Sequence, residues 1–183
     1  MDFALTADQR EIQALTRELA QAEIEPHAAE WDREHRFPVD LFAKLGELGL
    51  MGVCVPEELG GAGADFLSYI LVLEELSRAD AGVGVTVAVH TSAVTLPLLA
   101  FGDDEQRARF VPPLARGETI GSFALTEPGA GSDAGSLRTS ATREDGGWRI
   151  SGTKQWITNG SYCLLYTSPS PRDISGSRMP SSA

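Results

Sequence analysis

The residues most suited to binding a ligand lie at 123–133 (FALTEPGAGSD), where an apolar run leads into a glycine-rich turn. Gly129 and Gly131 would let the main chain approach a ligand closely, and consecutive amides in such a turn can cradle an anionic group such as pyrophosphate. Thr126 and Ser132 add hydroxyl donors. Taken alone, these residues fit a ligand site and a plain β-turn equally well.

The spacing of Gly129, Gly131 and Ala134 formally matches the fingerprint of dinucleotide-binding Rossmann sites, which requires a helix directly after it. Residues 136–142 (SLRTSAT) predict a strand instead. We therefore reject a Rossmann site.

A second segment follows at residues 151–160 (SGTKQWITNG). We predict a strand here, and Trp156 and Thr158, two residues apart, would then lie on one face of it. An aromatic plane beside a hydroxyl donor suits a flat heteroaromatic ligand, by stacking and one hydrogen bond at its edge. An ordinary core tryptophan is the simpler interpretation of this segment on its own.

The elements that must position these segments begin with helices over residues 1–117. Thr6 and Gln9 predict a capping box, and Pro26 should limit or kink the helix that follows. Its predicted apolar stripe consists of Ile12, Leu15, Leu19 and Ala22.

Four more elements complete this helical part. A helix from Pro38 should bury Leu41, Leu45 and Leu48, and residues 51–64 predict a loop. Asp65 should cap a helix that runs through Leu76. Residues 81–100 predict a buried helix, and a last helix runs from residue 103 to about residues 112–113.

After Gly117 the pattern changes to strands. Residues 119–126, 137–143 and 148–158 predict strands, and residues 144–147 (EDGG) predict a hairpin turn between the last two. The fold class is therefore α+β.

Composition excludes several classes of protein. The 183 residues carry 15 basic and 26 acidic side chains, a net charge of −11, which disfavours nucleic-acid binding. Two cysteines exclude a disulfide framework and a zinc ribbon. The start of the chain lacks the pattern of a signal peptide, so we expect a cytoplasmic protein. Residues 81–100 carry no charge but several polar residues, which favours a buried helix over membrane insertion.

His90 lies in that apolar stretch. We interpret it as a core histidine, and a role beside a substrate is the alternative. No cluster of histidine, cysteine and carboxylate residues predicts a metal site.

The two segments together resemble the flavin-binding part of the acyl-CoA dehydrogenases: LTEPGAGSD at residues 125–133, then SGTKQWITNG at 151–160. Residues 56–63 (PEELGGAG) and 101–118 (FGDDEQRARFVPPLARGE) are also typical of that family. The resemblance covers residues 1–161. It implies an N-terminal all-helical bundle followed by the first strands of a β-barrel-like middle domain.

The resemblance also implies roles for particular residues in binding FAD. Phe123, Leu125 and Thr126 would line the isoalloxazine ring. Gly131 and Ser132 would hold the pyrophosphate, and Ser132 would also contact the CoA substrate. The implied FAD-binding residues around the second segment are Trp156, Ile157 and Thr158, with Trp156 beside the ring and Thr158 near N5.

The activity implied is α,β-dehydrogenation of an acyl-CoA to a trans-2-enoyl-CoA, with electron-transfer flavoprotein as acceptor and a homo-oligomeric enzyme. The family's catalytic glutamate base belongs to a C-terminal bundle that this chain does not include, so we expect this chain alone to be inactive. Alternatives are a fragment of an acyl-CoA oxidase or related flavin monooxygenase, and a non-catalytic helical module that binds acyl-CoA or a partner.

Residues 162–183 depart from the family pattern. Residues 163–173 (CLLYTSPSPRD) can be reverse-translated into a string that resembles an adapter of a common transposase-based sequencing library, and residues 177–183 can be encoded by a string that resembles its far end. We hypothesise that residues 163–183 are a read-through artefact joined to a truncated gene. The predicted organisation is a helical domain at 1–117, the start of a middle β-domain at 118–161 and a non-family tail at 162–183.

Overall fold

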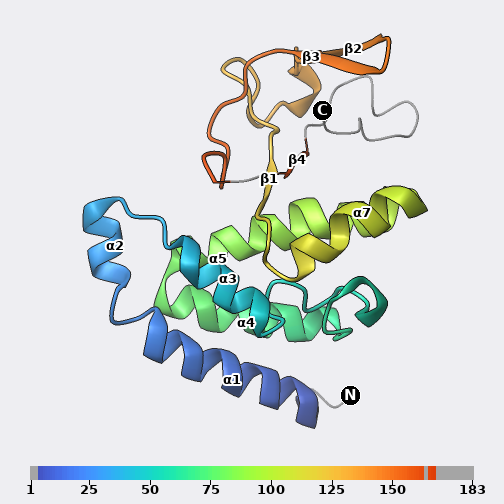
Figure 1. Cartoon of the computed structure of the whole chain (residues 1–183). Coiled ribbons are helices and arrows are strands. Elements are labelled where there is room, and N and C mark those ends of the chain that lie inside the picture. Colours follow the sequence, from blue (N-terminus) through green and yellow to red (C-terminus); the bar gives the residue numbers. More distant parts are fainter. Residues whose placement is uncertain (1–3, 163–164, 168–183) are drawn as a thin grey trace.

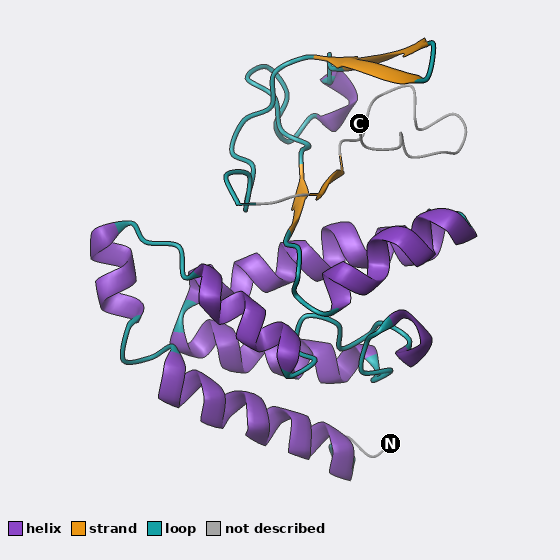
Figure 2. Cartoon of the chain, in the orientation of Figure 1, coloured by secondary structure: helices purple, strands orange, loops and turns teal. Residues whose placement is uncertain are grey.

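The computed structural model describes residues 4–162 and 165–167, which form a helical half and a strand-bearing half (Figure 1). The helices pack together in the lower part of the view, and one strand rises from them towards loops and a hairpin (Figure 2). This order confirms the predicted α+β class. Most of the predicted tail lies outside the described residues.

Helix α1 (Ala7–Glu23) begins at the predicted capping box. The main-chain N–H of Gln9 donates to Thr6 Oγ1 at 3.2 Å, and that of Thr6 donates to Gln9 Oε1 at 3.0 Å. The helix ends three residues before Pro26, as a proline that would remove a helical hydrogen bond predicts.

The predicted apolar stripe of α1 is wrong at two positions. Leu15 is 44% exposed and Ala22 is exposed, whereas Thr16 and Ile24 are completely buried. Thr16 tolerates burial because its hydroxyl donates to the carbonyl of Ile12 at 2.8 Å. Because the prediction counted only apolar residues, the predicted buried face of α1 does not coincide with the face that is buried.

Two shorter helices follow. Helix α2 (Ala28–Glu34) was not predicted, because Trp31 is its only large apolar residue. Helix α3 (Val39–Glu47) buries Leu41 and Leu45 as predicted. Leu48 is 42% exposed because the helix ends at the residue before it.

Two aspartates cap the central helices. Helix α4 (Phe66–Ala79) begins after Asp65, whose carboxylate accepts from the N–H of Ser68 at 2.7 Å, as predicted. Helix α5 (Ala81–Ala88) begins after Asp80, which accepts from the N–H of Val83 at 3.0 Å. Side-chain caps of this kind satisfy N–H groups that lack a helical partner.

Helix α5 continues through a π-helical segment (Val89–Thr95) into α6 (Leu96–Phe101). Together they are long and apolar enough to cross a membrane by length and composition alone. Half of the most apolar stretch is buried inside the protein, which is typical of a core helix. That burial agrees with the predicted buried helix.

Helix α7 (Asp104–Ala115) begins at a second capping box, between Asp103 and Gln106. It passes through Pro112 and Pro113 and ends at Ala115, two residues later than we predicted. Short 3-10 turns occupy Glu57–Leu59 and Ala134–Ser136.

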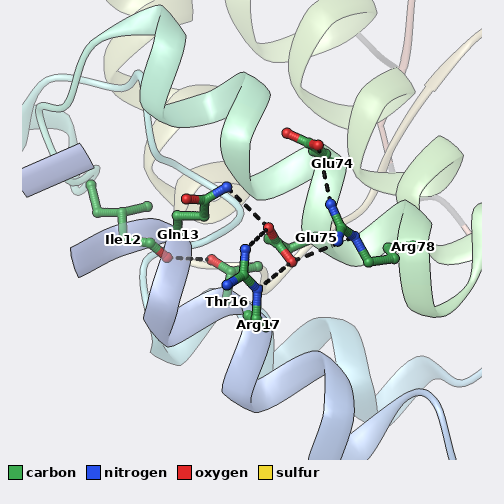
Figure 3. Close-up of polar contacts among 7 residues, drawn as sticks. All are labelled: Ile12, Gln13, Thr16, Arg17, Glu74, Glu75 and Arg78. Atoms are coloured by element: carbon green, nitrogen blue, oxygen red, sulfur yellow. Dashed lines mark hydrogen bonds and ion pairs between the residues drawn. The ribbon is translucent and has the colours of Figure 1, made fainter. Parts of the chain in front are cut away.

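A polar cluster joins α1 to α4 (Figure 3). Glu75 on α4, with a side chain only 1% exposed, accepts from Arg17 Nη2 at 2.7 Å, Arg17 Nε at 3.0 Å and Gln13 Nε2 at 3.0 Å. Arg78 Nε lies 3.8 Å from the same carboxylate. The arginine beside Glu75 lowers the pKa of that carboxyl below its usual value, so the buried group is charged and paired.

The described strands form two small sheets. β1 (Gly121–Phe123) pairs in parallel with β4 (Leu165–Thr167), and β2 (Ser140–Glu144) pairs antiparallel with β3 (Gly147–Ser151). The predicted hairpin is confirmed, with Gly146 at φ +88° in its two-residue turn. The strands predicted at 119–126 and 148–158 are shorter than expected, and β4 lies within the predicted tail.

The apolar core lies almost entirely among the helices. One buried cluster joins α1, α3, α4 and α5, and includes Phe42, Leu45 and Tyr69. A second joins α6 and α7 around Leu98 and Leu114. The helical half is therefore the platform from which β1 carries the chain to the two chemical segments.

Candidate functional site

The glycine-rich segment is a closed turn with an open outer face. The main-chain N–H of Glu127 donates to the carbonyl of Ala130 at 3.0 Å, and the N–H of Ala130 donates back to Glu127 at 3.1 Å. Gly131 and Ser132 are exposed just beyond this turn, whereas Leu125 and Thr126 before it are half-buried.

The second segment is not the strand we predicted. β3 ends at Ser151, and Trp156 has φ +60°, a left-handed conformation that is uncommon for a bulky residue. Trp156 and Thr158 therefore do not share a strand face. Trp156 is 81% exposed, so it is not a core tryptophan within the described chain.

Hydrogen bonds nevertheless bring the two segments together. The main-chain N–H of Gln155 donates to the carbonyl of Thr126 at 2.8 Å. Lys154 Nζ donates to the carbonyl of Leu125 and to the carboxylate of Glu127, both at 3.0 Å. The segment leaves the hairpin because its hydrogen bonds go to this loop, and Trp156 is the next residue along.

Glu127 is the most heavily bonded carboxylate of this half. It accepts from the main-chain N–H of Arg138 at 2.7 Å, from that of Thr139 at 2.9 Å and from the Thr139 hydroxyl. The Thr139 hydroxyl, the Arg138 amide and Lys154 together lower the pKa of Glu127 to about 2. None of Glu127, Lys154 and Thr139 was predicted to have a role, although a glutamate beside the turn and a lysine two residues before the tryptophan were visible signals in the sequence.

A polar junction holds this half on the helices through Gly121. Its N–H donates to His90 Nδ1 at 3.1 Å, and its carbonyl accepts from Asn159 Nδ2 at 3.1 Å. Only glycine fits here, because an added Cβ would lie 2.8 Å from the side chain of Val94. The same amide of Asn159 donates to the carbonyl of Thr86 at 3.4 Å.

His90 is a core residue, as the favoured interpretation held. It is completely buried, and burial lowers its pKa to about 4, so the ring is neutral and free to accept from Gly121. Its Nε2 makes no hydrogen bond of good geometry among the described residues, although the carbonyls of Leu114 and Met51 face the ring and partly offset the effect of burial on its pKa.

The remaining predicted residues also flank this arrangement. Phe123 ends β1 and is half-buried. Ile157 and Thr158 are half-buried, and the carbonyl of Thr158 accepts from the Ser122 hydroxyl on β1. All eight predicted residues therefore belong to β1, the turn after it or the segment tied to that turn.

These residues fit a flat ligand with an anionic group. A Cβ added at Gly129 or Gly131 would meet no atom within 4 Å, and neither has a positive φ, so packing within the described chain does not demand glycine there. Close approach of a ligand to the main chain is a physical reason for both. An exposed aromatic ring on a constrained backbone is a suitable stacking surface.

Other parts of the described chain offer weaker evidence for a functional site. Among the described residues there is no group of three or more His, Cys, Asp or Glu side chains that could hold a metal ion. A cavity of about 340 Å³ lies between α2, α3 and α5, walled by Trp31, Phe37 and Phe42, and none of the predicted site residues line it.

Comparison with known proteins identifies the family. The profile of the acyl-CoA dehydrogenase N-terminal domain matches residues 6–118, and that of the middle domain matches residues 122–171. A curated acyl-CoA dehydrogenase of Bacillus subtilis is 48% identical over 162 residues, which cover 88% of this chain and 43% of that protein. The middle-domain match extends ten residues past the predicted boundary at 161, and that boundary stays a prediction.

Solved structures agree with the match. One described as the electron transferring flavoprotein of Acidaminococcus fermentans superposes with a TM-score of 0.90 at 41% identity, covering 92% of this chain and 44% of that one. Acyl-CoA dehydrogenase of Bacillus anthracis, complexed with FAD, gives a TM-score of 0.84 at 38% identity, covering 90% and 28% of the two chains.

The N-terminal profile alone spans more than half of the sequence, and the chain therefore belongs to the acyl-CoA dehydrogenase family. The chain spans less than half the length of the curated relatives it matches.

Proposed function

We propose that this chain is the front portion of an FAD-dependent acyl-CoA dehydrogenase, an oxidoreductase that acts on CH–CH bonds and converts an acyl-CoA to a trans-2-enoyl-CoA. The observation that carries the proposal is the juxtaposition of an exposed glycine-rich turn with the exposed indole of Trp156, fixed by Lys154 and Gln155. When bound, FAD supplies the acceptor for the hydride that leaves Cβ.

The residues of this chain bind and orient the cofactor in this proposal. Phe123, Leu125 and Thr126 line the flavin ring, and the Thr126 hydroxyl donates to its edge. Trp156 and Ile157 cover the ring, and Thr158 donates near N5. Fixed donors of this kind stabilise negative charge that develops on a ligand.

In this proposal the pyrophosphate of FAD is bound beside the glycine-rich turn. Gly131 and Ser132, exposed beyond the Glu127–Ala130 turn, offer amide and hydroxyl donors to the pyrophosphate. Ser132 also contacts the CoA part of the substrate. We assign the catalytic base to no acid of this chain. Glu127, the buried carboxylate beside the turn, has its pKa lowered to about 2 by its hydrogen bonds, which makes it a poor acceptor of a proton near neutral pH.

The partners proposed are an acyl-CoA substrate, electron-transfer flavoprotein as electron acceptor and further copies of the same chain, in the cytoplasm. Similarity to the Acidaminococcus fermentans structure supports the electron acceptor. The oxidase and monooxygenase alternatives are not favoured, because the relatives matched are dehydrogenases. A non-catalytic helical module would leave the exposed turn and Trp156 without a purpose.

The test begins with the source DNA, amplified and sequenced with primers that flank codon 161. The protein that the locus encodes is then expressed in full and examined for bound flavin and for acyl-CoA-dependent flavin bleaching. Trp156→Ala should reduce flavin retention strongly. Trp148→Ala is the matched control, since Trp148 is also exposed but lies on the hairpin, and it should leave retention unchanged.

Protein that retains flavin and is bleached by an acyl-CoA supports the proposal. A well-folded protein that retains no flavin would refute it and would leave the binding-module interpretation. Equal flavin loss in the two tryptophan variants would refute the assignment of Trp156.

A further inference from the structure

We propose that Glu127 and Lys154 act as a clasp that positions the flavin-binding residues, by fixing Leu125 and Thr126 against the segment that carries Trp156. This inference rests on the proposed function, because it concerns the same cofactor site. Neither residue needs to contact the flavin, so both are positioning residues.

The hydrogen bonds of the clasp bracket Thr126. Lys154 Nζ holds the residue before it, through the Leu125 carbonyl, and the residue after it, through the Glu127 carboxylate. The main chain of Gln155 holds Thr126 itself. Three consecutive loop residues are thus tied to two consecutive residues of the other segment, which leaves the loop little freedom to shift along it.

Glu127 extends the clasp in a second direction. Its carboxylate also binds the main chain of Arg138 and Thr139, which lead into β2. The turn between these attachments is closed by the paired hydrogen bonds of Glu127 and Ala130. The exposed glycines therefore project from a base that is fixed on both sides, which is how a loop can present preorganised donors to a ligand.

The two clasp residues are shielded from solvent, whereas Trp156 is not. The side chains of Glu127 and Lys154 are 6% and 14% exposed, whereas Trp156 is 81% exposed. The large apolar side chains of Trp148, Ile150 and Trp156 are 47%, 52% and 81% exposed, so they do little to hold these segments in place. A shielded ion pair with further hydrogen bonds is then the available means of fixing geometry, and removing either partner leaves a buried charge unpaired.

The ionisation of Glu127 supports this role. With its pKa lowered to about 2, chiefly by the Thr139 hydroxyl, the carboxylate stays charged throughout the neutral and mildly acidic range. Glu127 therefore keeps the negative charge that its bond to Lys154 uses in neutral and mildly acidic solution.

The experiment uses the full-length protein that the source locus encodes, purified, stripped of flavin and titrated with FAD. Glu127→Gln and Lys154→Met should each weaken FAD affinity roughly 10-fold or more, as expected when one partner of a buried charged pair is lost. The visible circular dichroism of the remaining bound flavin should also change, because the ring is held differently. A purely structural role would lower the folded fraction without altering that spectrum.

Three further variants sharpen the test. Lys154→Arg keeps the charge and the donors and should restore most of the affinity. Thr139→Val removes only one donor to Glu127, keeps a foldable protein if the stronger variants misfold, and should weaken binding less. Glu144→Gln is the matched control, because it breaks the exposed ion pair with Arg149 on the hairpin and should change nothing.

The double variant Glu127→Gln/Lys154→Met should weaken binding by less than the sum of the two single effects, since the ion pair between the two residues is lost in both single variants. Wild-type affinity and spectrum in Glu127→Gln, Lys154→Met and Thr139→Val would overturn the clasp while leaving the proposed function intact. A wild-type protein that binds no FAD would instead refute the proposed function, and the clasp with it.

Discussion

The helical half and the strand-bearing half are built on different principles. The largest fully buried side chains, among them Phe42, Leu45 and Tyr69, all lie in the helical half of the described chain. Beyond residue 120, the large side chains of Trp148, Ile150 and Trp156 are 47%, 52% and 81% exposed. The residue types of the helices are thus explained by their own packing, whereas those of the strands are explained by polar ties and by surfaces they offer to other groups.

Truncation of matched apolar residues should expose this difference most strongly. Leu45→Ala removes a completely buried side chain and should lower the free energy of unfolding by about 3 to 4 kcal/mol. Ile150→Ala removes a half-exposed one and should cost less than about 1 kcal/mol. Urea unfolding followed by far-ultraviolet circular dichroism measures both. Similar losses would mean that the hairpin packs far more tightly than its exposure indicates.

The junction between the halves should respond to pH through His90. Its folded pKa of about 4 lies below the unfolded value of 6.5, so the unfolded chain takes up a proton first as the pH falls. Stability should therefore be greatest above about pH 6.5 and fall by about 3 kcal/mol as the pH approaches 4.

The control for this prediction is the variant His90→Asn, whose side chain can still accept a hydrogen bond from the N–H of Gly121 but does not titrate. The difference in unfolding free energy between the two proteins should change across pH 6.5 to 4.5 and level off above that range. Because the lowered pKa of Glu127 acts only below its unfolded value of about 4.5, this window isolates the histidine. Parallel curves for the two proteins would show that the ring can be protonated in place.

Sequence reasoning succeeded where structure is decided locally. The caps at Thr6 and Asp65 and the turn at Gly146 each depend on residues a few positions apart, and all three are confirmed. The candidate site residues were predicted from a resemblance to a family rather than from a periodic pattern of apolar residues. Helix α2 was missed because its packing rests on one tryptophan.

The bent backbone of residues 151–160 could not be predicted from the sequence, because it depends on contacts with residues far away in the chain. The positive φ of Trp156 follows a hydrogen bond from Gln155 to Thr126, residues far apart in the sequence. Lys154 and Glu127 are likewise 27 residues apart in the sequence. Such contacts are fixed by tertiary structure, so a local pattern predicted a strand where the chain instead bends to the loop.

Each half of the described chain buries one carboxylate with several hydrogen bonds, and the role of that carboxylate differs between the halves. Glu75 joins two helices that already share an apolar core, whereas the residues bonded to Glu127 belong to neither buried apolar cluster of the described chain. Glu75→Gln should therefore reduce stability by only about 1 to 2 kcal/mol, because Arg17 is half-exposed and can return to water.

Glu74→Gln is the matched control for this smallest effect. Glu74 is the preceding residue, its side chain is 54% exposed, and it pairs with Arg78 at the surface, so its loss should cost less than about 0.5 kcal/mol. Urea unfolding at neutral pH distinguishes the two. If both variants unfold like the wild type, the cluster of Figure 3 contributes orientation rather than stability, and the helical half rests on its apolar packing alone.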